Sequence, residues 1–168
     1  DDNDKYAVGH GLAPRLTYGF SLGAEWNGFD FSCLFQGNAG LQVYWQDKFY
    51  MGYINYGDVI NKEIAEGAWR EGRTNATYPR LLTGLNTLNA QPSDFWVQNK
   101  SYLRLKNVQI GYKIPKKLLQ KLDISQLRLY TSLENMLTFT SYKGIDPEIS
   151  GTTYPTMKQI TVGVNVVF

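Results

Sequence analysis

Few residues of this chain have side chains suited to catalysis. His10 is the sole histidine and Cys33 the sole cysteine among 168 residues. A Ser-His-Asp or Cys-His arrangement needs a positioned base, and Cys/His metal sites need several ligands at set spacings, so the sequence favours neither. The Gly9-x-Gly11 pair is followed by a proline and is not a phosphate-binding loop. We therefore predict no enzyme activity, no cofactor and no metal centre.

Two carboxylates, Asp146 and Glu148, flank a proline in what reads as a turn. Their oxygens are of the kind that ligate a hard cation. Acidic residues in turns more commonly fix the loop by accepting hydrogen bonds from backbone amides. Both interpretations are open at the level of sequence.

Aromatic residues concentrate in the stretch 46–101, where they are mixed with Asn, Gln and Arg. Ring faces with amide and guanidinium neighbours suit sugar rings or peptide segments. The same rings can instead pack the core of the stretch itself or contact another subunit. A short helix is predicted at 58–68, with Asp58 as its cap. The candidate ligand-binding residues are Tyr50, Tyr53, Tyr56, Trp69, Tyr78 and Trp96.

The elements that hold these residues are predicted to be strands. Residues 156–168 alternate apolar and polar side chains, which is the period of an extended strand. Such a strand lies either half-buried in a soluble sheet or between lipid and water. An aromatic residue at the last position is typical of outer-membrane barrels, so we expect the second. One face carries Ile160, Val162, Val164, Val166 and Phe168, and the other carries Gln159, Thr161, Gly163 and Asn165.

Four further strands are predicted, at 16–26, 29–36, 102–114 and 127–137. The Asn27-Gly28 pair between the first two is the signal of a type I′ hairpin turn. In the third strand the apolar parity changes near Lys106-Asn107, which predicts a β-bulge. Strands of ~10 residues or more, joined alternately by short turns and long loops, describe an outer-membrane barrel.

Parity also predicts which residues share one end of the strands. With the carboxyl terminus on the periplasmic side, four outward-facing aromatic residues fall near one interface, as an aromatic girdle would. These residues are Trp26, Phe29, Tyr112 and Phe168. Residues 115–122 predict one or two helical turns that begin with proline and share an apolar face of Leu118, Leu119 and Leu122. Their lysines either approach lipid phosphates or are simply solvated.

Composition excludes several other classes of protein. Lys and Arg number 17 against 15 Asp and Glu, so there is little attraction to nucleic acid. No apolar run approaches the ~18 residues of a membrane helix. The start, Asp1-Asp2-Asn3-Asp4, resembles the middle of a loop rather than a signal peptide, so we expect a fragment. Bacterial barrels use an even number of strands from ~8 upwards, so five strands need completion by further chain.

Several motifs recur in a set order along the second half of the chain. They are Ser101–Pro115, Leu127–Tyr130 with Glu134–Thr138, Tyr142–Glu148, Tyr154-Pro155 and the closing strand to Phe168. Together they resemble the late barrel strands of the SusC/RagA family of TonB-dependent outer-membrane transporters. Weaker resemblances lie upstream, at Pro14, Tyr18-Gly19-Phe20, Phe29-Asp30 and Gln36-Gly37.

The resemblance implies an all-β fold, an antiparallel transmembrane barrel of about 22 strands with an amino-terminal plug. Residues 1–168 would supply the last five strands, and 46–101 would be a long extracellular loop. It implies a multi-pass protein in the outer membrane of a Gram-negative bacterium, importing oligosaccharides or oligopeptides. Implied partners are a SusD-like surface lipoprotein, the lipid bilayer and, through the missing amino-terminal region, the TonB complex.

Phe168 would be part of the signal that the barrel-assembly machinery reads, rather than only a girdle aromatic. The alternative to the whole interpretation is a soluble all-β carbohydrate-binding module. In such a module Val162 and Val164 would lie in the core of a closed sandwich.

Overall fold

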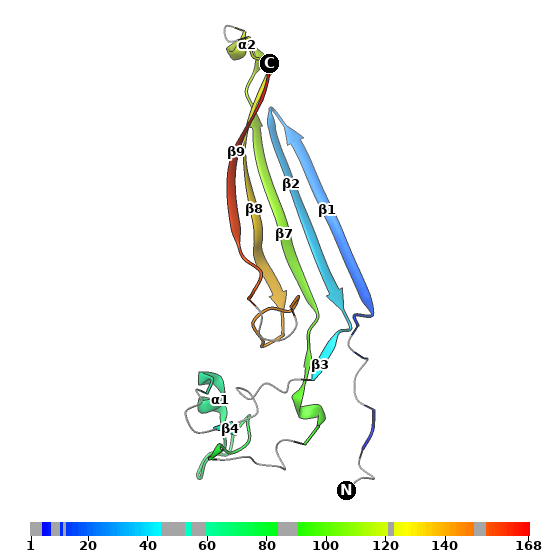
Figure 1. Cartoon of the computed structure of the whole chain (residues 1–168), viewed down its shortest axis with the longest axis vertical. Coiled ribbons are helices and arrows are strands. Elements are labelled where there is room, and N and C mark those ends of the chain that lie inside the picture. Colours follow the sequence, from blue (N-terminus) through cyan, green and yellow to red (C-terminus); the bar gives the residue numbers. More distant parts are fainter. Residues whose placement is uncertain are drawn as a thin grey trace. The chain divides into compact units, whose positions relative to one another are not determined.

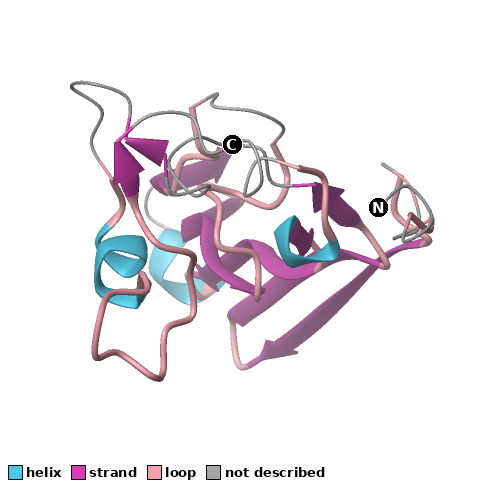
Figure 2. Cartoon of the chain, turned by 90° about the horizontal axis from the view of Figure 1, so that it is seen from below, coloured by secondary structure: helices cyan, strands magenta, loops and turns pink. Residues whose placement is uncertain are grey.

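The computed structural model describes residues 5–7, 11, 13–44, 53–54, 60–83, 91–120, 123–149 and 154–168. The chain divides into two compact units. One comprises residues 10–42 and 99–168, and the other residues 1–9 and 43–98. Strands dominate the described structure and the helices are short (Figure 2). No helix in the described parts of the chain has both the length and the apolar character to cross a membrane.

The larger unit is built on one antiparallel sheet of five long strands (Figure 1). Its order is β1-β2-β7-β8-β9, so strands that follow one another in this unit are also neighbours in the sheet. The carboxyl-terminal strand predicted within 156–168 thus pairs with the strand predicted at 127–137. The strands are β1 (Leu16–Trp26), β2 (Phe29–Ala39), β7 (Tyr102–Lys113), β8 (Gln126–Thr140) and β9 (Gln159–Val167).

The hairpin turn and the bulge both lie where the sequence predicts them. Asn27 and Gly28 have φ of 48° and 87°, which is the left-handed conformation that a type I′ turn requires. In the pairing of β2 with β7, Leu34 faces Asn107 and Phe35 faces Leu105, so Lys106 is the extra residue of a bulge. The same irregularity continues into β8, where Asn135 has a φ of 54°.

The register places most apolar residues of the five strands on one face of the sheet. Leu34 is an exception, because it pairs with Ser21 and Asn107 on the other face. Phe29 pairs with Tyr112, and Leu129 pairs with Val164, so apolar residues meet apolar residues across the strands. Val162 is 79% exposed and Val164 59% exposed. The structure therefore does not have the closed sandwich in which these two valines would form the core.

The connections at the two ends of this sheet differ in length. One end carries the Asn27-Gly28 turn, α2 (Lys116–Leu119) and the carboxyl terminus (Figure 1). Long connections leave β2 and β8 at the opposite end. Pro115 is the cap of α2 rather than its first residue. The shared apolar face expected here is wrong in part, because Leu119 is buried while Leu118 points to solvent, and Leu122 lies outside the described residues.

The smaller unit has short elements. It contains α1 (Lys62–Gly67), a parallel pair of β4 (Tyr53–Ile54) with β5 (Leu82–Thr83), and the short 3-10 helix η2 (Asp94–Trp96). A further two-stranded sheet pairs β3 (Gln42–Tyr44) with β6 (Val97–Asn99).

The helix predicted at 58–68 is shorter than expected. Asn61 caps it, accepting a hydrogen bond from the Glu63 N–H at 2.9 Å. The proposed cap, Asp58, lies outside the described residues.

Candidate functional site

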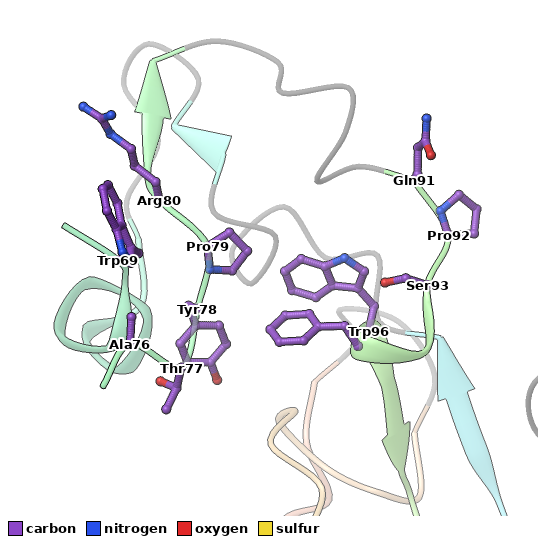
Figure 3. A pocket seen from close by; sticks show the side chains of 11 residues that line it. Trp69, Ala76, Thr77, Tyr78, Pro79, Arg80, Gln91, Pro92, Ser93 and Trp96 are labelled. Atoms are coloured by element: carbon purple, nitrogen blue, oxygen red, sulfur yellow. The ribbon is translucent and has the colours of Figure 1, made fainter. Parts of the chain in front are cut away.

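The smaller unit contains an open cavity of about 650 Å³. Figure 3 shows two segments facing each other across it, with Trp69 and Tyr78 on one side and Trp96 on the other. The volume falls in the range of ~300–1,000 Å³ that small-molecule sites occupy. The lining residues are Trp69, Ala76, Thr77, Tyr78, Pro79, Arg80, Gln91, Pro92, Ser93, Phe95 and Trp96.

Backbone hydrogen bonds fold the chain from α1 to Arg80 back on itself. The Trp69 N–H donates to the Tyr78 carbonyl at 3.0 Å, and the Tyr78 N–H donates to the Gly67 carbonyl at 3.1 Å. A Cβ atom at Gly67 would lie 2.6 Å from side-chain atoms of Thr77 and Tyr78, so a larger residue there would force these side chains to move. The Tyr78 hydroxyl donates to Glu63 Oε1 at 2.9 Å and ties the turn to the helix. One wall of the cavity is thus held by the helix end.

The opposite wall is an aromatic pair at η2. Phe95 and Trp96 meet edge to face, with ring centroids 4.8 Å apart, and Tyr78 meets Phe95 edge to face at 6.4 Å. Trp96 is 3% exposed, whereas Phe95 is 50% exposed. Trp96 therefore serves as the local core, and Phe95 offers its ring to solvent and to the cavity.

A cation lies over the exposed ring of the first wall. The Arg80 guanidinium carbon is 5.7 Å from the centre of the Trp69 ring, a cation–π arrangement (Figure 3). Trp69 is 44% exposed. Both residues also line a neighbouring cavity of about 550 Å³. The pair therefore forms a partition between two cavities.

The structure brings together three of the six predicted ligand-binding residues, Trp69, Tyr78 and Trp96. Tyr50 and Tyr56 lie outside the described residues, as does the side chain of Tyr53, although its backbone forms part of β4. The aromatic signal missed the polar members of the site. Arg80 stands two residues after Tyr78, but no local sequence signal indicates that its guanidinium joins the aromatic wall.

A second polar cluster lies in the larger unit, where the connection between β8 and β9 meets β7. Arg104 on β7 donates from Nη2 to Asp146 Oδ1 at 2.7 Å, from Nη1 to Glu148 Oε2 at 2.9 Å and from Nε to Thr138 Oγ1 at 2.9 Å. Lys106 Nζ donates to the same Glu148 oxygen at 2.7 Å. We call Arg104, Lys106, Asp146 and Glu148 the loop anchor.

The anchor decides between the two sequence interpretations of Asp146 and Glu148. Asp146 accepts hydrogen bonds from the backbone N–H of Glu148 at 2.8 Å and of Thr156 at 3.1 Å, as a loop-fixing carboxylate does. It also forms an ion pair with Arg104. Among the described residues no group of three or more metal-ligating side chains is present. The carboxylates therefore bind cationic side chains of β7.

The pKa values of Asp146 and of the nearby Lys100 are both shifted. Burial alone would raise the pKa of Asp146, but hydrogen bonds from Arg104 and from the backbone of Glu148 and Thr156 outweigh it and hold the pKa below the ordinary 3.8. Burial lowers the pKa of Lys100, and the charge of Asp146 opposes part of that shift. Lys100 Nζ also donates to the Ile149 carbonyl, so it binds the same loop.

The polar face of the sheet carries a third set of charges near the short-turn end. Arg128 on β8 pairs with Asp30 on β2, with Nε donating to Oδ1 at 2.9 Å, and also donates to Gln109 at 3.0 Å. The pair passes over Gly111 of β7, where a Cβ would lie 2.6 Å from atoms of both side chains. Lys113 Nζ lies 3.4 Å from Glu25 Oε1 at the strand ends.

The predicted girdle residues lie where the register groups them. Trp26 pairs with Phe29, and Phe29 pairs with Tyr112, so these three form one row on the apolar face. The rings of Phe29 and Tyr112 have centroids 4.5 Å apart. Phe168 follows β9 at the same end and is exposed. That this row contacts lipid remains a prediction.

No protein-family model matches the chain, but individual relatives do. TonB-dependent receptor P3 of Formosa agariphila is 31% identical over 171 residues, which cover 92% of this chain and 16% of the relative. TonB-dependent receptor SusC of Bacteroides thetaiotaomicron is 25% identical over 100% of this chain and 16% of that protein.

A solved structure agrees with these sequence matches. The structure of the RagAB peptide importer in the open-open state superposes with a TM-score of 0.73 at 31% identity, over 94% of this chain and 17% of that one. The chain thus spans 16% or 17% of the length of these three proteins.

Proposed function

Because this chain belongs to the SusC/RagA type of TonB-dependent receptors, we propose that it is the carboxyl-terminal barrel segment of an energised nutrient importer. The complete protein would sit in the outer membrane of a Gram-negative bacterium and take up oligosaccharides or oligopeptides. One of the similar structures is a peptide importer by name, which keeps the peptide class beside the glycan class. The relatives are receptors and transporters, so a non-enzymatic role fits them.

The observation that carries this proposal is the division of the five-stranded sheet into one apolar and one polar face. Leu129 and Val164 are neighbours on the apolar face, while Arg128 and Asn165 are neighbours on the polar face. Strands of 9–15 residues are long enough for a tilted membrane crossing. A sheet with lipid on one side and a watery lumen on the other needs this division.

The remaining assignments follow from that orientation. The apolar row of Trp26, Phe29 and Tyr112 would lie at the periplasmic interface, where aromatic rings concentrate. The stretch 46–101 would then be extracellular. Five strands of an estimated barrel of about 22 would be completed by other strands of the same protein, because open edges cannot face hydrocarbon.

The partners proposed for the complete protein are a SusD-like surface lipoprotein, the TonB complex and the barrel-assembly machinery. Phe168 would be part of the assembly signal. Deleting Phe168 should lower the amount of assembled receptor more than the transport per assembled molecule. Unchanged surface abundance after this deletion would argue for a plain girdle residue.

Uptake by the source bacterium tests the proposed function directly. Cells should import a fluorescently labelled oligosaccharide or oligopeptide, and deletion of the gene or collapse of the proton gradient should abolish that import. The complete protein should also need detergent to leave the outer-membrane fraction. Release into buffer alone would instead support the soluble carbohydrate-binding module.

A further inference from the structure

We propose that the cavity between Trp69 and Phe95 binds a uronate-bearing unit of an oligosaccharide, with the sugar carboxylate on Arg80. The inference rests on the proposed function only in taking the ligand to be an imported oligomer. It goes further by naming the chemical class and the charge-binding residue.

The charge of the cavity is the first argument. Among the described lining residues, Arg80 is the single ionisable one that is charged at neutral pH. No described carboxylate forms an ion pair with it, whereas Arg104 and Arg128 each have acidic partners. A planar guanidinium matches a carboxylate through two parallel hydrogen bonds. Its position over the Trp69 ring, with the centre 5.7 Å away, restricts where such a carboxylate binds.

The neutral groups of the lining give the second argument. Phe95 and Trp69 present exposed rings, which suit the apolar C–H face of a sugar ring. Thr77, Gln91 and Ser93 add hydroxyl and amide groups to the same lining, and Figure 3 shows them at its margin. Such groups pair with sugar hydroxyls. The lining thus combines a ring platform, polar handles and one cation.

The backbone of the lining favours a sugar over a peptide. An extended peptide is commonly held by main-chain hydrogen bonds to the free edge of a strand. The lining residues come from the turn that ends at Arg80, from the segment before η2 and from η2 itself, and none lies in a named strand. Strand-like backbone in the described walls is limited to the isolated bridge of Tyr78 with Ala68, so the cavity offers chiefly side chains.

The partition formed by Trp69 and Arg80 extends the inference to a neighbouring sugar unit. The cavity of about 550 Å³ beyond it is also lined by Arg70 and Glu71. Arg70 and Glu71 carry opposite charges, so this neighbouring cavity does not select the charge of the adjoining unit. An oligosaccharide whose uronate carboxylate lies on Arg80 would therefore extend a further sugar unit into this cavity.

Titration calorimetry on the complete receptor in detergent tests the proposal, with α-1,4-linked trigalacturonate as the probe. Its methyl ester is the uncharged matched probe. The wild-type receptor should bind the acid roughly tenfold more tightly than the ester, and added salt should reduce that difference. Arg80→Gln should remove the difference, and Arg80→Lys should retain part of it, because lysine keeps the charge without the planar fork.

The matched control is Lys62→Gln, which removes an exposed cation of the same unit that lines neither cavity. It should bind both probes as the wild type does. Equal binding of acid and ester by the wild type, no saturable binding of either, or an unchanged acid preference in Arg80→Gln would overturn the proposal. Tighter Arg80-dependent binding of tetra-alanine with a free carboxyl terminus would assign the site to peptides instead.

Binding and import are separate measurements here. Arg80-dependent binding without uptake in cells would leave the site in place and contradict the importer. Uptake of labelled oligomers with no difference between acid and ester would keep the importer and reject the uronate site.

Discussion

The two arginines Arg104 and Arg80 are used in opposite ways. Arg104 is 4% exposed on its side chain and donates to Asp146, Glu148 and Thr138. Arg80 is exposed, lies on the ring of Trp69 and has no ion pair among the described residues. The charge of Arg104 is therefore compensated inside the protein, whereas the charge of Arg80 is exposed at the surface and available to a ligand.

The difference shows how to separate positioning residues from binding residues. A buried guanidinium with three internal acceptors has little capacity left for a ligand, and its loss leaves buried carboxylates unpaired. A guanidinium held only by an aromatic face costs little to expose and keeps its donors available. Whether an arginine can bind a ligand therefore depends on how many hydrogen-bond acceptors its guanidinium already has within the protein.

The largest predicted effect is at the loop anchor. Arg104→Ala should destabilise the attachment of the loop 141–156 by about 3–5 kcal/mol, because it strands the buried Asp146 without its partner. Tryptic cleavage after Lys143 in the complete receptor should accelerate accordingly. Lys62→Ala breaks an exposed pair with Glu66 and is the control that should change nothing measurable. Equal cleavage rates in Arg104→Ala and wild type would place the loop's stability elsewhere.

A charged substitution on the apolar face of the sheet should have an intermediate effect on stability. Val164→Arg should lower the free energy of unfolding of the complete receptor by ~2–4 kcal/mol if the site lies near the membrane midplane. Thr161→Arg, on the other face of β9, should cost much less. Heat-dependent unfolding followed by gel mobility measures both. A larger cost at Thr161 would reverse the assignment of the two faces.

Acid should weaken the anchor before it affects the cavity. Since the pKa of Asp146 is lowered on folding, its contribution is complete above about pH 4 and is lost as pH falls through the lowered value. Hydrogen-exchange protection of the Glu148 and Thr156 N–H groups, corrected for intrinsic rates, should fall in that range. The Ser125 N–H donates to the Val167 carbonyl and is the control without a titrating acceptor. Parallel loss at all three amides would indicate general unfolding.

The smallest predicted effect on stability is at the cavity. Arg80→Ala should lower the free energy of unfolding by about 1 kcal/mol or less, because it removes only an exposed cation–π contact with Trp69. The same unfolding measurement used for Val164→Arg applies. A cost approaching that of Arg104→Ala would show that Arg80 is structural, and the comparison drawn above would fail.

Sequence reasoning performed well where the signal was local. The alternation of side chains placed β1 at its observed bounds, and the change of parity at Lys106 located the bulge. The helix start was missed because Asp58 and Asn61 are both good caps, and composition alone does not choose between them.

The charge clusters were beyond local patterns. Arg104 and Asp146 are 42 residues apart, and their pairing depends on how the connection after β8 folds back. Arg80 joined the cavity through the turn at Gly67, which alternation and motif spacing do not report. Faces of strands can be read from a periodic sequence, but the partners of a side chain on a loop require the loop's conformation.

The bridge from Arg128 to Asp30 has a mechanical consequence. It joins β8 to β2 across the intervening β7 and passes directly over Gly111. If β7 slid by one residue, Ile110 or Tyr112 would take the place of Gly111 beneath the bridge and bring a large side chain there. The same shift would move the side chains of β7 to the opposite face of the sheet. The bridge therefore acts as a shear stop that opposes sliding of β7 between its neighbours. Gly111 lets the bridge pass close to β7, and the bridge in turn opposes a force applied along that strand.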